Sequence, residues 1–466
     1  MNLERPNKLV EKSSREPKAM AADGSNTDED VKIFLEYMEK KIKYTSPFLY
    51  TIDRVLKPIR DVKPEDYTPR LISIGPLHHQ EPHLIPMEAH KLRLVKEFLY
   101  RPFNKATLGD YLREMKGYEK EVRQCYSEKN PLNSDDFVRM MVVDGCFLLQ
   151  LILGWTHYLN GDSIFNETWM PHIMRDLMLL ENQLPFFVLN KLCKLCNGES
   201  RPDTIYDDTR NFIWNFLRLG QDVMLSRPDS ETKHFLDYAR HLYVSPFLHE
   251  HEQRFIRRKH SATELKKAAA VKFQKTNTRR FTDITFDGED GKLNIPTIYI
   301  DNSTESLLRN LIALEQSHQY SVKYVTNYAI FMNDLINSPK DVKLLKKDGI
   351  FEGQVNPIEV ADLYKNLLKE VTVPYDVCFS QVYHELESYY DSSWYRLGTI
   401  RHRCVSKICK MMKCVKTKYF DSPWSLIAFI AASTVLGLTM EPTIASFKSL
   451  KQKGVAAVSH ETGVVE

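Results

Sequence analysis

Histidines and acidic residues gather in one short stretch near the start of the chain, where His78, His79, His83, Glu88 and His90 lie close together. Imidazole and carboxylate groups of this kind bind zinc, and they also suit a hydrolytic iron or manganese site. No pair combines the helical His-x-x-x-His spacing with an adjacent glutamate, the combination that identifies a zinc hydrolase. We therefore predict a proline-rich surface loop and no metal site.

Two groups of polar residues interrupt apolar stretches that we expect to be helical. Asp144 and Cys146 lie in the first stretch, and Glu181, Asn182 and Gln183 lie in the second. Burying a polar side chain is costly unless it is paired, so such residues serve either catalysis or a hydrogen-bonded core network. We favour the network and predict no catalytic residue. Nothing nearby in the sequence would activate Cys146, which we expect to pack as a small hydrophobe.

The remaining motifs do not identify an enzyme. Cys193 and Cys196 form a lone C-x-x-C without a second pair at zinc spacing, and the sequence contains no glycine-rich phosphate loop, nucleophile elbow or kinase motif. We predict no cofactor. The alternative is a membrane-bound hydrolase that uses the loop of His78, His79 and His83, or the pair Asp144 and Glu181.

Composition favours a helical protein of a reducing compartment. The 466 residues contain only 17 glycines and 22 prolines, too few for a collagenous or turn-dense all-β chain. The formal net charge of +3 is too small to indicate a nucleic-acid partner. Eight cysteines are too sparse for a disulfide framework, and the first residues lack the apolar core of a secretory signal.

Hydrophobic periodicity predicts a mainly α fold with a large helical body at residues 30–400 and a disordered segment at residues 1–29. An irregular connector, Ser46 to Pro86, precedes the main helices. Residues 280–300 change to an alternating pattern around the turn-rich DGEDG, which predicts the one β-hairpin. The helices are expected at Met87–Phe103, Thr107–Tyr126, Ser134–Trp155, Thr168–Leu195 with a kink or break at Pro185, Thr304–Gln319, Val322–Asn337, Ile358–Val371 and Val377–Tyr395, and we expect Ser134–Trp155 to be central and buried.

A segment near the carboxy terminus is apolar enough to span a membrane. Residues 422–440 read SPWSLIAFIAASTVLGLTM without a charge, and a helix of this length covers roughly 28 Å against a bilayer core of roughly 30 Å. The alternative is a buried core helix, but no later segment could cover it. The residues that we expect to anchor the helix in lipid are Trp424, Ile427, Phe429, Ile430, Val435 and Leu436.

Basic residues precede this span. Residues 401–421 form a basic juxtamembrane strip, and the polar tail 441–466 carries fewer basic residues. The positive-inside rule therefore predicts a cytosolic body on the plasma membrane or another endomembrane. Cys404, Cys409 and Cys414 lie among the lysines of the strip, where reversible palmitoylation and attraction to anionic lipid are both chemically sensible. The alternative is a solvated basic helix with unmodified thiols.

Seven segments, in this order, carry a resemblance to a known family: LISIGPLHH (Leu71–His79), MEAHKLRLVKEFL (Met87–Leu99), MMVVDGCFLLQLIL (Met140–Leu153), DLMLLENQLPFFVL (Asp176–Leu189), ATELKKAAAVKF (Ala262–Phe273), STESLLRNLIALEQ (Ser303–Gln316) and YFDSPWSLIAFIAA (Tyr419–Ala432). Together they resemble the plant-specific domain-of-unknown-function 247 family over roughly residues 30–440. The resemblance implies a plant membrane protein with one carboxy-terminal span.

We accordingly expect a membrane-anchored, non-enzymatic protein that acts in recognition or signalling. Some grass members of the family are associated with the pollen side of self-incompatibility, so the resemblance also allows a recognition determinant of that kind. The expected partners are membrane lipid, through the span, and an unidentified protein, with a homo-oligomer as a further option and no nucleic acid.

Overall fold

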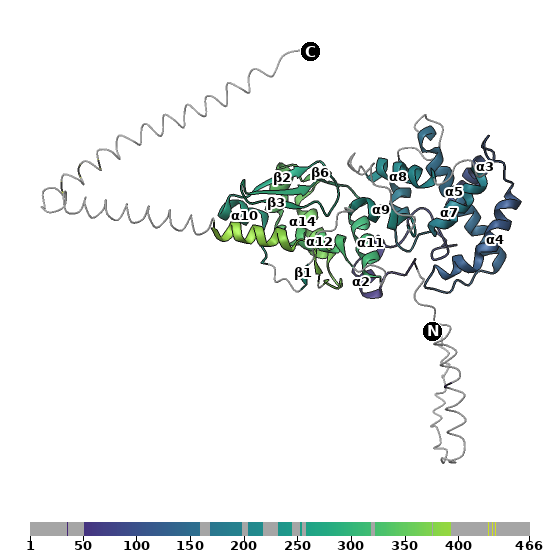
Figure 1. Ribbon diagram of the computed structural model, residues 1–466, viewed down its shortest axis with the longest axis horizontal. Coiled ribbons are helices and arrows are strands. Elements are labelled where there is room, and N and C mark those ends of the chain that lie inside the picture. The colour runs from purple at the N-terminus through teal and green to yellow at the C-terminus, as the bar shows by residue number, and fades with distance from the viewer. Residues whose placement is uncertain are drawn as a thin grey trace, which may run out of the picture.

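The computed structural model describes residues 51–158, 168–197, 204–217, 232–244, 252–253, 258–317, 322–374 and 376–392, together with Leu35, Ile427, Ala431 and Thr434. Within this part the chain is mainly helical, as expected, with three small sheets. The body is elongated (Figure 1): α3, α4, α5 and α7 lie at one end, the strands lie with α10, α12 and α14 at the other, and α9 and α11 lie between.

The first half is a helical bundle built around α5. Its elements, in chain order, are α2 (Lys57–Val62), the 3-10 helix η1 (Pro64–Asp66), α3 (Pro86–Leu99), α4 (Leu108–Gln124), α5 (Ser134–Tyr158), α6 (Met170–Leu177), α7 (Phe186–Asn197) and α8 (Thr204–Leu217). Helix α5 contacts α3, α4, α7 and α8. Because four helices cover it, its side chains are apolar almost all round, and the prediction of a central buried helix is confirmed.

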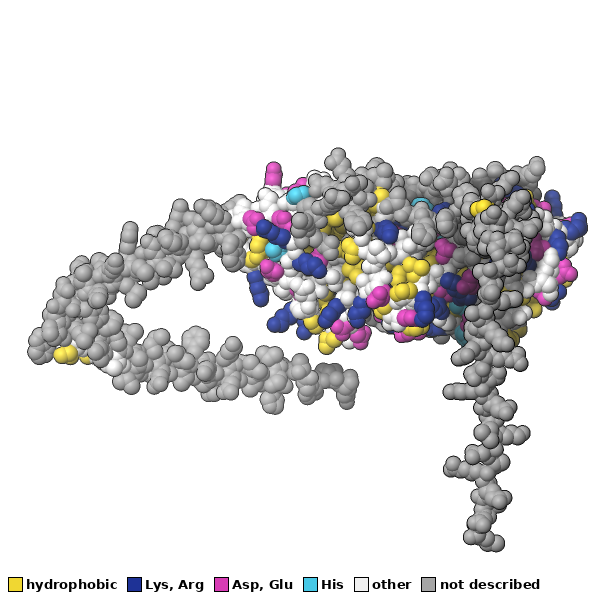
Figure 2. Space-filling model, turned by 90° about the horizontal axis from the view of Figure 1, so that it is seen from below, with side chains coloured by type: hydrophobic (Ala, Val, Ile, Leu, Met, Phe, Trp, Pro, Cys, Tyr) yellow, Lys and Arg dark blue, Asp and Glu magenta, His cyan; other side chains and the backbone are white. Residues whose placement is uncertain are grey.

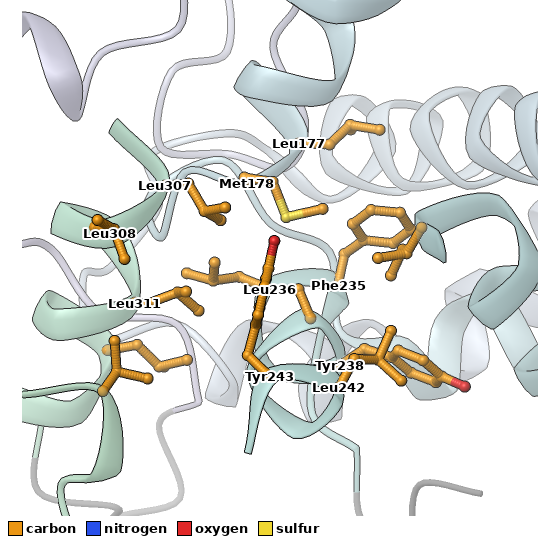
Figure 3. Close-up of a cluster of buried hydrophobic side chains, with 14 of the residues drawn as sticks. Leu177, Met178, Phe235, Leu236, Tyr238, Leu242, Tyr243, Leu307, Leu308 and Leu311 are labelled. Carbon is orange, nitrogen blue, oxygen red and sulfur yellow. The ribbon is translucent and has the colours of Figure 1, made fainter. Parts of the chain in front are cut away.

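A layer of apolar side chains joins the two halves. Helix α9 (Phe235–Tyr243) lies between α6 and α11 (Thr304–Gln316), and Figure 3 shows its Leu236 and Tyr243 pointing toward Leu307 and Leu311 of α11. All four side chains are buried. Burial of this surface holds the halves together, since apolar area removed from water stabilises the fold by roughly 25 cal/mol per Å².

The second half combines helices with three small sheets. Its elements are β1 (Glu252–Gln253), α10 (Ala262–Ala269), β2 (Lys272–Thr276), β3 (Thr285–Asp287), β4 (Lys292–Pro296), β5 (Ile298–Ile300), α12 (Tyr324–Leu335), α13 (Pro339–Lys347), β6 (Phe351–Gly353), α14 (Pro357–Leu367), β7 (Asp376–Val377) and a helix at 380–392. The sheet orders are β2-β4-β3, β5-β6 and β1-β7.

The predicted hairpin is confirmed in its turn and first strands. Strands β3 and β4 pair antiparallel, with Phe286 opposite Leu293. The prediction of one continuous second strand was wrong, because β4 ends at Pro296 and β5 pairs in parallel with β6 of a different sheet. Strand β2, which pairs in parallel with β4, was missed. Its partner β4 follows β3 in the sequence, and parallel pairing between separated strands gives no local sequence signal.

One other prediction needs correction. The connector from Ser46 to Pro86 is not wholly irregular, since it contains α2 and η1. The stretch Thr168–Leu195 was expected to kink or break at Pro185, and the break is confirmed: α6 ends at Leu177, and α7 begins at Phe186, directly after Pro185. Proline disfavours a helical conformation at the residue before it, which separates the two helices.

The predicted membrane span falls almost entirely outside the described residues. Within 422–440 only Ile427, Ala431 and Thr434 are described; they are helical, and Ile427 is 56% exposed. In the described part of the chain one helix, Ser134–Gly154, is long and apolar enough to cross a membrane, but it is 83% buried in the body and is a core helix. The predictions for residues 1–29 and for Cys404, Cys409 and Cys414 also lie outside the described residues.

An aromatic stack between α9 and the second half generates a stability prediction. The Phe281 ring lies between Tyr243 and Tyr328, with both ring centroids 4.5 Å away. Phe281→Ala should therefore lower the free energy of unfolding by about 3–5 kcal/mol, measured by chemical denaturation of the full-length protein. Phe103→Ala, at a side chain that is 46% exposed, is the matched control and should change stability little. Equal losses in both variants would contradict this account of the stack.

Candidate functional site

A segment at residues 70–75, buried from Ile72 onward, runs between the helices of the first half, and side chains accept hydrogen bonds from most of its backbone amides. The Asp176 carboxylate, at the end of α6, accepts hydrogen bonds from the amides of Arg70 (3.0 Å), Leu71 (2.6 Å) and Ile72 (3.1 Å). The same carboxylate accepts a hydrogen bond from Arg175 Nη1 at 2.7 Å. Because buried amides must be paired, Asp176 takes the role that a neighbouring strand has in a sheet.

Asn182 and Asp144 continue this pairing along the segment. Asn182 Oδ1 accepts from the Ile74 amide at 2.7 Å, and its Nδ2 donates to the Ile72 carbonyl at 3.1 Å. Asp144 Oδ2, from the centre of α5, accepts from the Gly75 amide at 2.8 Å. The hydrogen-bonded core network expected of these polar residues is therefore present.

Lys91 completes the pairing of Asp144. Lys91 Nζ lies 2.7 Å from Asp144 Oδ1 and 2.7 Å from Glu88 Oε1, and its side chain is fully buried. Burial opposes the charge on Lys91, but the two carboxylates outweigh it and raise the lysine pKa above its ordinary value. Lys91 therefore stays protonated and forms an ion pair inside the core. Removing one partner of such a buried pair lowers the stability of the fold.

Glu181 is the centre of a second cluster. Its carboxylate accepts hydrogen bonds from Arg54 Nη1 (2.7 Å), Arg60 Nη1 (2.6 Å) and the Val55 amide (2.9 Å), and His78 Nε2 lies 3.2 Å from Oε2. Burial opposes ionisation of Glu181, but His78, the two arginines and the amide outweigh it and lower the pKa to about 2. The cluster joins the residues before α2 to the connection between α6 and α7.

Two of the histidines share a carboxylate, since His78 Nδ1 pairs with Glu81 Oε1 and His83 Nδ1 lies 3.7 Å from Glu81 Oε2. His78 is 2% exposed, so its assignment to a surface loop was wrong; its Nδ1 pairs with Glu81 while Nε2 faces Glu181. His83 is half exposed and its Nε2 lies 3.0 Å from the Pro69 carbonyl, and the His90 ring instead faces Trp169. Among the described residues, no group of three or more His, Cys, Asp or Glu side chains could hold a metal ion.

The prediction that Glu181, Asn182 and Gln183 lie inside a helix was also wrong. All three lie in the irregular connection between α6 and α7. Gln183 Nε2 donates to the carbonyls of Leu177 and Leu179, each at 2.7 Å, so side chains replace the backbone hydrogen bonds that a helix would make. Asn and Gln side chains can compete with helical pairing in this way, and Pro185 removes one further donor.

Several members of the network were missed in the sequence. Arg54, Arg60 and Asp176 pair with residues that lie more than a hundred positions away in the sequence. No local sequence pattern predicts such partners. Lys91 did leave a signal, because it occupies the buried face of α3 between Met87 and Leu94, where an apolar residue is expected.

The cysteines of the first half are buried thiols. Cys146 on α5 and Cys193 and Cys196 on α7 all lie in the core. Burial raises the pKa of the Cys193 thiol to about 12, and burial also raises the pKa values of Cys146 and Cys196. Since the thiolate is the reactive form, the C-x-x-C pair has the properties of core packing residues.

A groove in the surface of the first half is lined by other residues. A groove of about 410 Å³ lies beside the end of α4 and is lined by residues of 120–130 together with Phe137. Tyr126 belongs to this lining, but its hydroxyl donates to the Gln183 carbonyl at 3.0 Å and is not available to a ligand. Asp144, Glu181 and His78 do not line the groove.

Comparison with known proteins identifies a matching family and similar plant proteins. Residues 52–438 match the DUF247 family, described as plant protein of unknown function. UPF0481 protein At3g47200 of Arabidopsis thaliana is 28% identical over 438 residues, which cover 86% of this chain and 87% of the relative. Putative UPF0481 protein At3g02645 of the same plant is 23% identical over 483 residues, covering 83% and 88%. No solved structure matches.

The Glu181 cluster should make stability depend on pH. Its folded-state pKa of about 2 is below the ordinary 4.5, so ionised Glu181 stabilises the fold above pH 4.5 and the contribution is lost as the pH falls toward 2. A pKa shift of this size corresponds to a contribution of roughly 3 kcal/mol to the free energy of unfolding. Glu181→Gln should therefore be less stable than wild type at pH 6, by denaturant titration, with the difference shrinking toward pH 2.5. A difference independent of pH would contradict the assignment.

The turn at Gly75 gives a second prediction. Gly75 has a φ of +72°, and an added Cβ would lie 2.4 Å from the Gln183 carbonyl oxygen. Gly75→Ala should cost roughly 2–5 kcal/mol, combining the left-handed backbone with overpacking. Gly117→Ala is the matched control, since nothing lies within 4 Å of its Cβ position on α4 and alanine favours helix by about 1 kcal/mol. The melting temperatures of the two variants should move in opposite directions.

Proposed function

This chain belongs to the DUF247 family of plant proteins of unknown function, and on that premise we propose that it is a membrane-anchored, non-enzymatic protein whose helical body recognises another protein. Its role is in signalling or recognition, and recognition of the self-incompatibility kind is the specific version. The body faces the cytosol at the plasma membrane or another endomembrane.

One observation carries the non-enzymatic part of the proposal. The groups best suited to chemistry are used to hold backbone and to pair with one another inside the body: Asp144 binds Gly75 and Lys91, and Glu181 binds Val55, Arg54 and Arg60. A hydrolase needs such groups to face a concave site that substrate can enter. The Asp144 and Glu181 side chains are only 1% and 0% exposed.

The hydrolase alternative would use the same residues differently. It needs His78 to move a proton to or from a substrate, but both ring nitrogens of His78 already face the carboxylates of Glu81 and Glu181. A general base must reach the reacting proton within hydrogen-bond distance. The contacts of His78 therefore favour a positioning role within the fold over catalysis.

The proposal of a membrane anchor is based on the amino-acid sequence. The 19 uncharged residues at 422–440 meet the length requirement of a bilayer span, and the basic strip 401–421 favours a cytosolic body. Cys404, Cys409 and Cys414 would add reversible acylation beside the span. A tail anchor holds the body at the membrane surface, where it can meet a partner.

Proximity labelling in the native plant membrane tests the proposed recognition. The labelling enzyme is fused to the amino terminus of the full-length chain, and the matched control carries Ile427→Arg and Val435→Arg. A protein labelled by the wild type but not by the released control, which then binds the purified chain at fixed stoichiometry, supports the proposal. Turnover of an ester or amide substrate that His78→Asn abolishes, without loss of folding, would overturn it.

The anchor itself gives a direct prediction. Arginine at the centre of a span adds about 2.5–3.5 kcal/mol to insertion, so Ile427→Arg with Val435→Arg should add roughly 5–7 kcal/mol and move the protein to the soluble fraction of an alkaline carbonate extraction. The matched control is Ile358→Arg, on α14, where a side chain that is 62% exposed should tolerate arginine and leave the protein in the pellet. Wild-type protein in the carbonate-soluble fraction would exclude the anchor.

A further inference from the structure

Exposed apolar side chains gather at the end of the body formed by α3 and α4. On the solvent face of α3, Leu92, Lys96 and Tyr100 follow one another at helical spacing, with Leu92 55% and Tyr100 78% exposed. Phe103, 46% exposed, follows in the α3–α4 connection, and Leu108, 47% exposed, begins α4. We call Leu92, Tyr100, Phe103 and Leu108 the α3–α4 patch. Single exposed apolar residues are ordinary, but four of the ten exposed large apolar side chains among the described residues fall within residues 92–108, which indicates an interaction surface.

Basic side chains accompany the patch on the same elements. Those basic residues are Arg93, Lys96, Arg101, Lys105 and Arg113. Two of them are paired with acidic side chains: Arg93 Nε lies 3.4 Å from Glu97, and Arg113 Nη2 lies 2.7 Å from Asp110. Five basic residues against two acidic residues still leave residues 92–113 with a net positive charge, whereas on the face that Figure 2 shows basic and acidic side chains are interspersed.

The shape of the patch favours a lipid surface over a peptide. Tyr100, Phe103 and Leu108 protrude from a helix end and a connection, and they do not line the pockets found beside Tyr126, Tyr243 or Asp334. Protein hot spots are usually complementary to a pocket, whereas aromatic and aliphatic side chains flanked by lysine and arginine enter the headgroup region of a bilayer without a shaped partner. Tyrosine is also enriched at that interface.

We propose that the α3–α4 patch docks on an anionic lipid surface, with the apolar side chains inserted at the headgroup level and the basic side chains against acidic headgroups. The attraction is worth about 1 kcal/mol, roughly fivefold in affinity, for each basic side chain close to the surface. The patch lies at the end of the body farthest from residues 380–392 (Figure 1), so contact there lays the body along the membrane instead of leaving it upright on its carboxy-terminal end.

Photocrosslinking of the full-length chain tests this contact. Benzoylphenylalanine replaces Tyr100, and in a matched control it replaces Ile358, which is 62% exposed but has the acidic neighbours Glu359 and Asp362. The chain is synthesised with phosphatidylcholine vesicles that contain or lack phosphatidylserine. Because the readout is contact at one position, it does not depend on whether residues 422–440 span the bilayer.

The proposal expects lipid adducts at position 100 in vesicles with phosphatidylserine, several-fold fewer in vesicles without it, and few at position 358 in either. Changing Arg93, Lys96 and Lys105 together to Gln should reduce the adducts several-fold while leaving the melting temperature unchanged, since all three side chains are exposed. Equal adducts at both positions, yields independent of phosphatidylserine, or an adduct of twice the chain mass, which would make the patch an interface between copies, would each overturn it.

Discussion

The fold depends on satisfying the backbone of residues 70–75 inside a helical bundle that offers it no neighbouring strand. Asp176, Asn182 and Asp144 supply the acceptors that a sheet would otherwise provide. An unpaired buried amide costs about 1–3 kcal/mol, so this pairing fixes where the segment must lie. The three acceptors come from α5 and from the end of α6 and its following connection, which binds the segment to both.

The same constraint explains why the connection between α6 and α7 is irregular. In a helix, the amides and carbonyls of residues 178–185 would pair with one another. The side chains of Asn182 and Gln183 would then not be needed as partners for the backbone. In the structure Gln183 links the Leu177 carbonyl to the Leu236 amide of α9. The connection therefore reaches both the buried segment and the layer that joins the two halves of the body.

The sequence predicts what local periodicity determines and misses what distant pairing determines. Helix α5 and the turn between β3 and β4 follow from apolar spacing and turn residues, and both are present. Strand β2 and the Arg54–Glu181 pair depend on partners that are distant in the sequence. No pattern in a single sequence indicates which residues these partners are. Burial of Glu181 was foreseeable from its apolar surroundings, but its arginine partners were not.

Two long apolar segments of the chain, Ser134–Gly154 and 422–440, show that hydropathy alone does not identify a membrane span. Ser134–Gly154 is long and apolar enough to cross a membrane, yet α3, α4, α7 and α8 cover it. The segment 422–440 is uncharged and follows the basic strip 401–421. An apolar helix must bury its surface in protein or in lipid. The proposed anchor places residues 422–440 in lipid, and the α3–α4 patch is proposed to meet the same surface.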